Sequence, residues 1–296
     1  MNGLQGRIAG APITWGVDGS PGWGHLMDRD RVMSEMAQVG LSATEIGPDG
    51  YLPLDPDELR DYMARYDLQV VGGFVPAVLH RQDRFDAGLA YVDRASRQLA
   101  ATGAAVLVLG ATSHLDGYDT PVVMDEDEWQ TLFANLRRLQ DVVSANGLTT
   151  ALHPHWGMAI AGQGEVERLL ETSDVDLCLD TGHLYVAGAD PVGVARLAQG
   201  RVIHVHLKDV DADLAARVRT GEMTFKQATL EGMFTAVGDG DVDIAGVIDV
   251  LETSGYGGWY VLEQDVSLDR DPPPGEGPLL DAEKSVRYLE SLSRPS

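Results

Sequence analysis

Imidazole and carboxylate side chains gather at the ends of four consecutive apolar segments in the second half of the chain. Neutral imidazole nitrogen and carboxylate oxygen are natural ligands of Mn²⁺, Co²⁺, Fe²⁺ and Zn²⁺. The sequence has one cysteine, Cys178, which argues against a structural zinc site built from clustered thiolates. The polar residues at these segment ends are His153, His155, Asp180, His183, His204, His206, Lys208 and Glu263.

These segments belong to a longer pattern in which short apolar, β-rich runs alternate with helical stretches. Such alternation predicts a parallel sheet, and eight units indicate closure into a (β/α)₈ barrel, with an open doubly wound sheet as the alternative. The expected strands are 7–13, 43–46, 69–75, 105–109, 149–153, 176–180, 202–207 and 259–263. The expected helices are 29–39, 55–66, 86–101, 126–146, 165–172, 191–198, 244–253 and 281–292.

The length fits one such barrel. The chain has 296 residues, and a barrel of this kind needs roughly 250. We therefore expect a single domain over residues 1–296, in which the long connections 208–243 and 269–278 are loops that follow strands rather than domain boundaries. Loops of this kind usually build the active site of a barrel.

Charge and composition narrow the classes of partner. The formal net charge of −24 disfavours binding to nucleic acid and to anionic membranes. No apolar run approaches the roughly 18 residues of a membrane span, and residues 1–12 do not resemble a secretion signal. A lone cysteine suits a reducing compartment, so we expect a cytoplasmic protein.

In a parallel barrel the carboxyl ends of all strands meet at one mouth. The four polar strand ends should therefore meet there and form a metal site. Taken singly, each end has a simpler interpretation: a histidine at a strand end is often only a satisfied polar residue, and Asp180-Thr181-Gly182 could be a turn that caps a helix. Four successive polar ends favour the site. His114, in the loop after the expected fourth strand, is a further histidine expected at this mouth.

Other polar and aromatic residues are weaker candidates. Glu45 ends the second expected strand and could contact a polyol or act as a base, or it could be a plain loop carboxylate. Trp15 could form a pocket wall or simply pack in the core. Lys208 could stabilise an oxyanion or form a salt bridge with Asp209. The turn 238–240 is too short to indicate a phosphate site.

These motifs together resemble the xylose isomerase-like barrels, a group of sugar isomerases and epimerases with an endonuclease branch, and look most like the myo-inosose-2 dehydratases. The endonuclease branch requires more metal ligands and a basic groove, which the acidic charge disfavours. The resemblance covers nearly the whole chain. It is carried by residues 11–15, 44–47, 153–157, 180–183, 204–210, 225–240 and 258–265.

The resemblance implies one divalent metal held at the mouth. In the epimerases of this group the ligands are two glutamates, an aspartate and a histidine, and Asp180, His206 and Glu263 fall on three of those places. The fourth place, on the fifth strand, is His153 instead of glutamate. Because both glutamates move protons in the epimerases, this departure favours an elimination over a symmetric epimerisation. Mn²⁺ or Co²⁺ is expected first, with Zn²⁺, Fe²⁺ or Mg²⁺ as alternatives.

The implied activity is a lyase that dehydrates a cyclic keto-polyol, with 2-keto-myo-inositol as the first candidate, to a dione through an enolate. The expected base is Glu263, His153 or Glu45, the expected acid is His155 or His183, and Lys208 would stabilise the enolate. The residues expected to contact the substrate are Trp15, Glu45, His155, Trp156, His183 and Lys208.

Two rival functions and one assembly state stay open. The same site would serve a ketose epimerase or isomerase, and a non-catalytic sugar-binding barrel is the alternative outside enzymes. Residues 15–24 depart from the dehydratase pattern in the first loop, which leaves the exact polyol open. Members of such families are often dimers or tetramers, so a homo-oligomer is possible.

Overall fold

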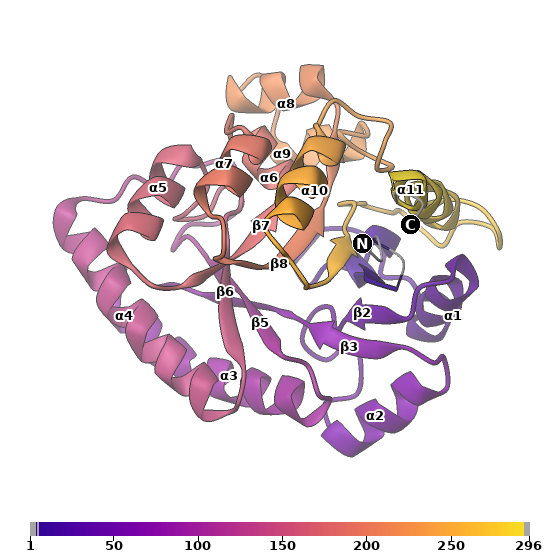
Figure 1. Ribbon diagram of the computed structural model, residues 1–296, viewed down its shortest axis with the longest axis horizontal. Coiled ribbons are helices and arrows are strands. Elements are labelled where there is room, and N and C mark those ends of the chain that lie inside the picture. Colours follow the sequence, from indigo (N-terminus) through magenta and orange to yellow (C-terminus); the bar gives the residue numbers. More distant parts are fainter. Residues whose placement is uncertain (1–3, 5, 293–296) are drawn as a thin grey trace.

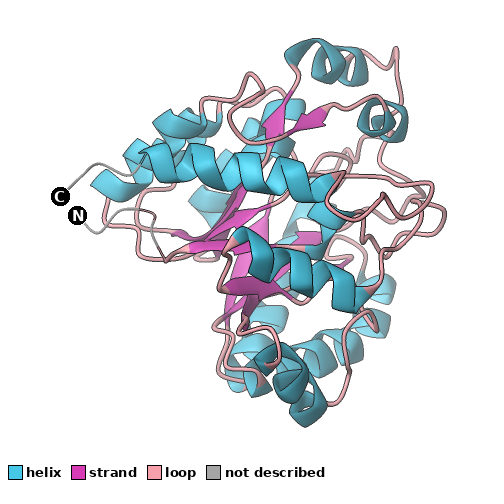
Figure 2. Ribbon diagram, turned by 90° about the vertical axis from the view of Figure 1, so that its right-hand side faces the viewer, coloured by secondary structure: helices cyan, strands magenta, loops and turns pink. Residues whose placement is uncertain are grey.

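A parallel sheet rolled into a barrel forms the centre of the molecule, and helices surround it (Figures 1 and 2). The structure is a computed structural model that describes residue 4 and residues 6–292, so both ends of the expected domain, 1–3 and 293–296, lie outside it. Within the described residues the sheet has nine strands in the order β3-β2-β1-β11-β8-β7-β6-β5-β4. The strands are β1 (Ile8–Gly10), β2 (Ala43–Glu45), β3 (Gln69–Gly72), β4 (Phe74–Ala77), β5 (Val106–Ala111), β6 (Thr149–His153), β7 (Asp176–Asp180), β8 (Val202–Leu207) and β11 (Tyr260–Leu262).

The barrel is closed by a single chain segment that occupies both ends of this strand order. β3 pairs with β2, β4 pairs with β5, and only Gly73 separates β3 from β4. The carbonyl of Gly72 accepts a hydrogen bond from Ile46 N on one side (3.2 Å), and the carbonyl of Gly73 accepts one from Val108 N on the other (3.0 Å). The expected third strand, 69–75, is therefore one barrel position split in two, and the predicted (β/α)₈ barrel is confirmed.

Helices follow most strands and pack on the outside of the barrel (Figure 1). Among the described residues, no helix is long and apolar enough to cross a membrane. The outer helices are α1 (Arg29–Val39), α2 (Pro56–Ala64), α3 (Gln82–Ala101), α4 (Glu126–Ala145), α5 (Gln163–Thr172), α7 (Pro191–Leu197), α10 (Ile244–Thr253) and α11 (Pro278–Leu292).

Several boundaries differ from the expected ones by a few residues, and two of the differences have an identifiable reason. Residues 12–13, expected in the first strand, belong to a short 3-10 helix, η1 (Pro12–Trp15), because a proline cannot donate to the strand ladder and suits the first position of a helix. Helix α3 begins at Gln82, four residues before the expected start. Its N-cap, Arg81, makes no capping side-chain hydrogen bond, so the sequence carried no start signal there.

The connections after β7 and β8 hold short elements, of which the sequence pattern indicates only a helix around residues 214–218. α6 (Thr181–Val186) follows β7 at once, and the long connection 208–243 contains α8 (Ala212–Arg219) and α9 (Phe225–Leu230). A small antiparallel pair, β9 (Asp209–Val210) and β10 (Phe234–Thr235), joins the start of this connection to its later part. Asp209 stabilises it: its carboxylate accepts hydrogen bonds from the backbone of Gly238, Gly240 and Val242. The turn 238–240 is thus a structural turn.

The alternation of side chains along the strands separates two kinds of core. On β5, Leu107 and Leu109 belong to the large core that includes helix residues, whereas Val106 and Val108 form a small cluster with Ala151 of β6 and Cys178 of β7. This cluster fills the barrel. Because alternate residues share a face, the residues two positions further along β6 and β7 point into the barrel at its mouth, above the cluster.

Barrel closure at Gly73 can be tested by adding a side chain. A Cβ at this position would lie 2.7 Å from Ile46 Cγ1 and 3.2 Å from Leu99 Cδ2, so Gly73→Val should destabilise the protein by about 1–3 kcal/mol through overpacking. Gly88→Val is the matched control, because no heavy atom lies within 4 Å of a Cβ built there in α3 and the expected change is within about 0.5 kcal/mol. Urea unfolding measures both; equal effects would contradict the packing argument.

Candidate metal centre

Four strand ends place their side chains at the same level of the barrel mouth. His153 is the last residue of β6, Asp180 is the last residue of β7, His206 lies on β8, and Glu263 directly follows β11. The strand register aligns Asp180 with His206 and His206 with Val261, so neighbouring strands bring these residues together. All four are at most 8% exposed.

One atom from each of the four residues lies within 4.8 Å of the corresponding atom of the other three. His153 Nε2 is 3.1 Å from Asp180 Oδ2, which is 3.6 Å from His206 Nδ1, and His206 Nδ1 is 3.1 Å from Glu263 Oε2. Tetrahedral ligands with bonds of about 2.1 Å are separated by about 3.4 Å. The observed separations therefore match the edges of a metal coordination polyhedron.

Glu45 fixes the orientation of one of these imidazoles. Its Oε1 accepts hydrogen bonds from His204 Nε2 (2.7 Å) and His206 Nε2 (2.9 Å). Burial alone would raise the pKa of Glu45, but the two imidazoles hold it well below its usual value, so the group is a carboxylate. With Nε2 bonded to Glu45, His206 directs Nδ1 toward the cluster, and the Glu45 carboxylate fixes the ring in the way that outer carboxylates fix metal-bound histidines.

Asp180 divides its two oxygens between structure and site. Oδ1 accepts a hydrogen bond from the backbone N–H of His183 (2.7 Å) and caps the N-terminus of α6, while Oδ2 faces the two imidazoles. The helix-cap interpretation and the metal-ligand interpretation of the Asp180 motif are therefore compatible. Thr181 adds a hydrogen bond from its hydroxyl to the Lys208 carbonyl (2.7 Å), which ties the ends of β7 and β8 together.

Lys208 provides a buried positive charge beside the cluster. Its Nζ lies 2.8 Å from Glu263 Oε2, 3.0 Å from Asp265 Oδ1 and 3.3 Å from Asp180 Oδ2, and not against Asp209. Burial alone would lower the pKa of Lys208, but Asp180, Asp265 and Glu263 overcome it and hold the pKa well above its usual value. Lys208 is thus an ammonium ion at the edge of the candidate metal site.

His155 and His183 lie face to face next to Lys208, with ring centroids 3.5 Å apart. His155 Nδ1 donates to the Trp156 carbonyl (2.7 Å), and Lys208 Nζ donates to His183 Nε2 (2.9 Å). Burial lowers the pKa of both rings, that of His155 to about 3, so both are neutral. His155 lines the cavity, whereas His183 is fully buried and lies off the cavity wall.

The two tryptophans expected at the substrate also lie off the cavity wall. Trp15 is fully buried, and its indole N–H donates to Glu35 Oε2 (2.8 Å) on α1. This contact agrees with the packing alternative for Trp15. Trp156 reaches the cavity only indirectly, through its carbonyl bond to His155.

A cavity of about 130 Å³ opens beside the cluster and contains residues that the sequence argument did not select. Asp265 lines it, and burial raises the pKa of this carboxyl to about 6. Phe74 and Tyr118 contribute aromatic walls. Asp265 follows Glu263 at an interval of two, so the period of a strand could have indicated it, whereas Phe74 and Tyr118 carry no polar signal that could have done so.

His114 does not join the cluster of imidazoles. Its Nδ1 lies 2.8 Å from His80 Nε2, between the loops after β4 and β5. Burial, together with His114, lowers the pKa of His80 to about 4. This pair is a separate, structural feature of the barrel mouth.

The donor set fits a divalent cation. Two imidazoles and two carboxylates suit Mn²⁺, Co²⁺, Fe²⁺ or Zn²⁺. The Nδ1 atoms of His153 and His206 are buried and have no hydrogen-bond partner among the described residues. Buried polar atoms of this kind usually have a partner, and a bound cation would supply one for His206 Nδ1. These observations define a barrel protein with a candidate metal centre at its mouth.

Comparison with known proteins agrees with this class. The chain belongs to the xylose isomerase-like TIM barrel family, which it matches over residues 33–292. An inosose dehydratase from Geobacillus kaustophilus is 31% identical, over 97% of this chain and 94% of that protein. The rhizopine catabolism protein MocC of Rhizobium meliloti is 33% identical, over 90% of this chain and 82% of that protein.

A solved structure shows the same fold at lower sequence identity. The IolI protein, crystallised with a bound zinc atom, superimposes with a TM-score of 0.74 and is 14% identical, over 98% of this chain and 100% of that chain. The family resemblance inferred from the strand-end motifs is therefore confirmed, and so is its likeness to the inosose dehydratases.

The role of Glu45 in orienting His206 can be measured through metal affinity. Glu45→Gln replaces the charged oxygen that bonds both imidazoles with a neutral amide. His206 is then held less firmly, so the affinity for Mn²⁺ or Co²⁺ should fall by about 10–100-fold. Glu35→Gln is the control, because that carboxylate bonds to Trp15 and Arg31 away from the cluster. Competition with a metal-indicator dye measures both, and an unchanged affinity in Glu45→Gln would contradict the orienting role.

The buried His80 should make stability depend on pH. In the unfolded chain histidine has a pKa of about 6.5, and in the fold the pKa of His80 is about 4. Between these values the unfolded state binds more protons, so the contribution of His80 to stability decreases as pH falls from about 6.5 to about 4. Urea unfolding of wild type and His80→Gln should show a difference that changes across this window; parallel curves would contradict the prediction.

Proposed function

We propose that the protein is a metal-dependent hydro-lyase that removes water from a cyclic keto-polyol, with 2-keto-myo-inositol as the first candidate substrate. The observation that carries the proposal is the cluster of His153, Asp180, His206 and Glu263 beside a small cavity that also holds Lys208. Relatives named inosose dehydratase, 31% and 34% identical over at least 90% of this chain, support the reaction class.

The cavity supports a substrate with a single ring. An engineered apolar cavity of about 150 Å³ holds one benzene molecule, so a cavity of about 130 Å³ admits no more than one six-membered ring. One part of its lining is apolar and includes Ile13, Val17 and Phe74. The remainder carries the imidazoles, carboxylates and Lys208, so a ring could place its C–H surface on the first part and its oxygens on the second.

The chemistry divides between the metal and the chain. A divalent ion held by the four candidate ligands would act as a Lewis acid, polarising the substrate ketone and acidifying the neighbouring C–H. Lys208 is kept charged by the carboxylates around it, so it would stabilise negative charge on the enolate oxygen. Because Lys208 is 3% exposed, this interaction is poorly screened by water.

Proton transfer requires a base at the α-carbon and an acid at the departing hydroxyl. Glu263 and Asp265 line the cavity and both contact Lys208 Nζ, and both are candidates for the base. Glu45 is less suited, because its Oε1 is already bonded to two imidazoles. His155 is neutral and its Nδ1–H is used by Trp156, which favours a hydrogen-bond acceptor over the expected acid.

We propose Mn²⁺ or Co²⁺ as the working metal, with Zn²⁺, Fe²⁺ or Mg²⁺ as alternatives, because a donor set of two carboxylates and two imidazoles suits divalent ions of this kind. We also propose that residues 1–296 form one domain, because the length of the chain fits a single barrel. We propose a homodimer or homotetramer as the assembly state, and the molecular mass of the protein in solution would test it.

Turnover of 2-keto-myo-inositol by the metal-loaded protein tests the proposal. Dione absorbance should appear with the wild type, and Asp180→Ala should lose both retained metal and turnover, since it removes a ligand from a buried cluster. Asp176→Ala is the matched control at the opposite end of β7 and should keep metal and turnover. Metal content by elemental analysis and the rate of dione formation are the two measurements.

The other outcomes separate the rival functions. Interconversion of free ketoses without dione formation would replace the lyase by an epimerase or isomerase. A wild-type protein that takes up neither Mn²⁺ nor Co²⁺ would instead support a non-catalytic sugar-binding barrel. Full activity in Asp180→Ala would contradict the proposed ligand set.

A further inference from the structure

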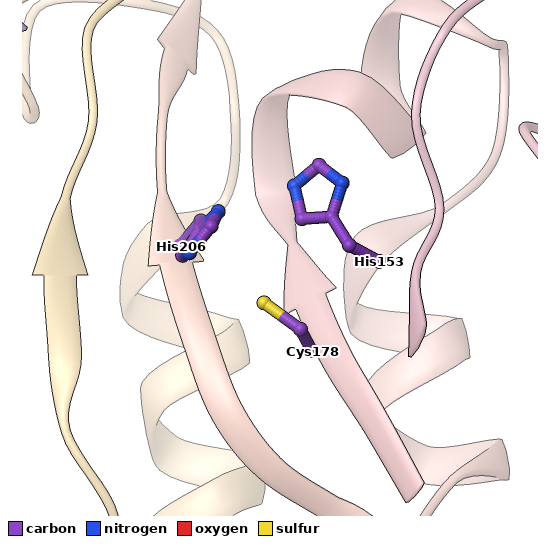
Figure 3. A group of neighbouring side chains, drawn as sticks. All are labelled: His153, Cys178 and His206. Carbon is purple, nitrogen blue, oxygen red and sulfur yellow. The ribbon is translucent and has the colours of Figure 1, made fainter. Parts of the chain in front are cut away.

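Cys178 lies inside the barrel, one step below the candidate metal centre. It precedes Asp180 by two residues on β7, so both side chains point into the barrel, with the thiol deeper. Its Sγ and one ring nitrogen each of His153 and His206 lie within 4.8 Å of one another. Figure 3 shows the thiol directed toward the space between the two imidazoles. All three side chains are at most 2% exposed.

Unpartnered nitrogens in this group point to a ligand. The Nδ1 atoms of His153 and His206 are buried and have no hydrogen-bond partner among the described residues. His206 Nε2 is bonded to Glu45, so Nδ1 is the ring nitrogen on which a bound cation would replace the proton. A buried thiol flanked by these two imidazoles adds a sulfur donor, which the centre of two imidazoles and two carboxylates lacks.

We propose that Cys178, His153 and His206 form a binding site for a soft divalent cation, represented by Cd²⁺ or Zn²⁺, directly beneath the oxygen-rich centre. Thiolate sulfur binds soft ions in preference to Mn²⁺ or Mg²⁺, which prefer carboxylate oxygen. On binding, the S–H bond of Cys178 breaks, the sulfur–metal bond forms and one proton leaves to solvent; no group is oxidised or reduced.

The two cation sites cannot be filled at once, because both need His153 and His206. A soft ion therefore displaces Mn²⁺ from the centre, and the protein holds one ion per chain in either case. This inference uses the imidazoles of the proposed metal centre but does not depend on which reaction the protein catalyses.

Titration of the metal-free protein with Cd²⁺ tests the proposal directly. Cys178 is the only cysteine in the sequence, so any ultraviolet sulfur-to-cadmium charge-transfer band must come from it. The band should saturate at one equivalent of Cd²⁺ in the wild type and be lost in Cys178→Ser. Absence of the band in the wild type would overturn the proposal.

Mn²⁺ binding provides the matched readout. Measured by electron paramagnetic resonance, it should persist in Cys178→Ser, which also shows that this variant is folded. In Asp180→Asn it should be lost while the Cd²⁺ band remains, because this change removes a carboxylate ligand and leaves the thiol. A wild-type protein that shows the Cd²⁺ band but no Mn²⁺ binding would remove the proposed centre and leave the soft site.

Competition tests the shared imidazoles. Adding one equivalent of Cd²⁺ to the Mn²⁺-loaded wild type should release one equivalent of Mn²⁺, and in Cys178→Ser the release should need a larger excess of Cd²⁺. Simultaneous retention of both ions by the wild type would overturn the assignment of His153 and His206 to both sites.

Discussion

Buried carboxylates at one end of a closed barrel set the constraint on which the site depends. Glu45, Asp180, Glu263 and Asp265 are all at most 8% exposed, and uncompensated charges at such depth are costly. The ammonium of Lys208 balances part of this charge, and the pKa of His206 is also held well above its usual value, against burial, by Cys178, Glu263 and Glu45. A divalent cation would take the place of the His206 proton and add to the compensating positive charge, so the metal site and the stability of the mouth share an electrostatic origin.

The candidate ligands show how this cluster is held rigid. Asp180 uses one oxygen to cap α6 and the other to face the imidazoles, and His206 uses Nε2 to bond Glu45 and Nδ1 to face the carboxylates. Each side chain is therefore oriented by a structural bond before any ion binds. Preorganised ligands of this kind need little rearrangement on binding.

The fold was largely predictable because it depends on local patterns. Strand periodicity located β6, β7 and β8 to the residue, and the glycine after α1 marked its end. The splitting of the third barrel position at Gly73 was not predictable, since it follows from hydrogen bonds to strands on both sides. The start of α3 was missed because its N-cap carries no capping side chain.

The sequence by itself determined which residue types stand at the strand ends, and a parallel barrel must bring those ends together. It therefore indicated a metal site among these strand ends, and the resemblance to the xylose isomerase-like barrels implied His153, Asp180, His206 and Glu263 as its ligands. Only the tertiary structure decided the contacts of the residues around the site. Glu45 bonds two imidazoles, Trp15 bonds Glu35 on α1, and Asp265 pairs with Lys208. The physical reason is that strand period and length are local, whereas the contacts of a buried charge depend on which distant strands close around it.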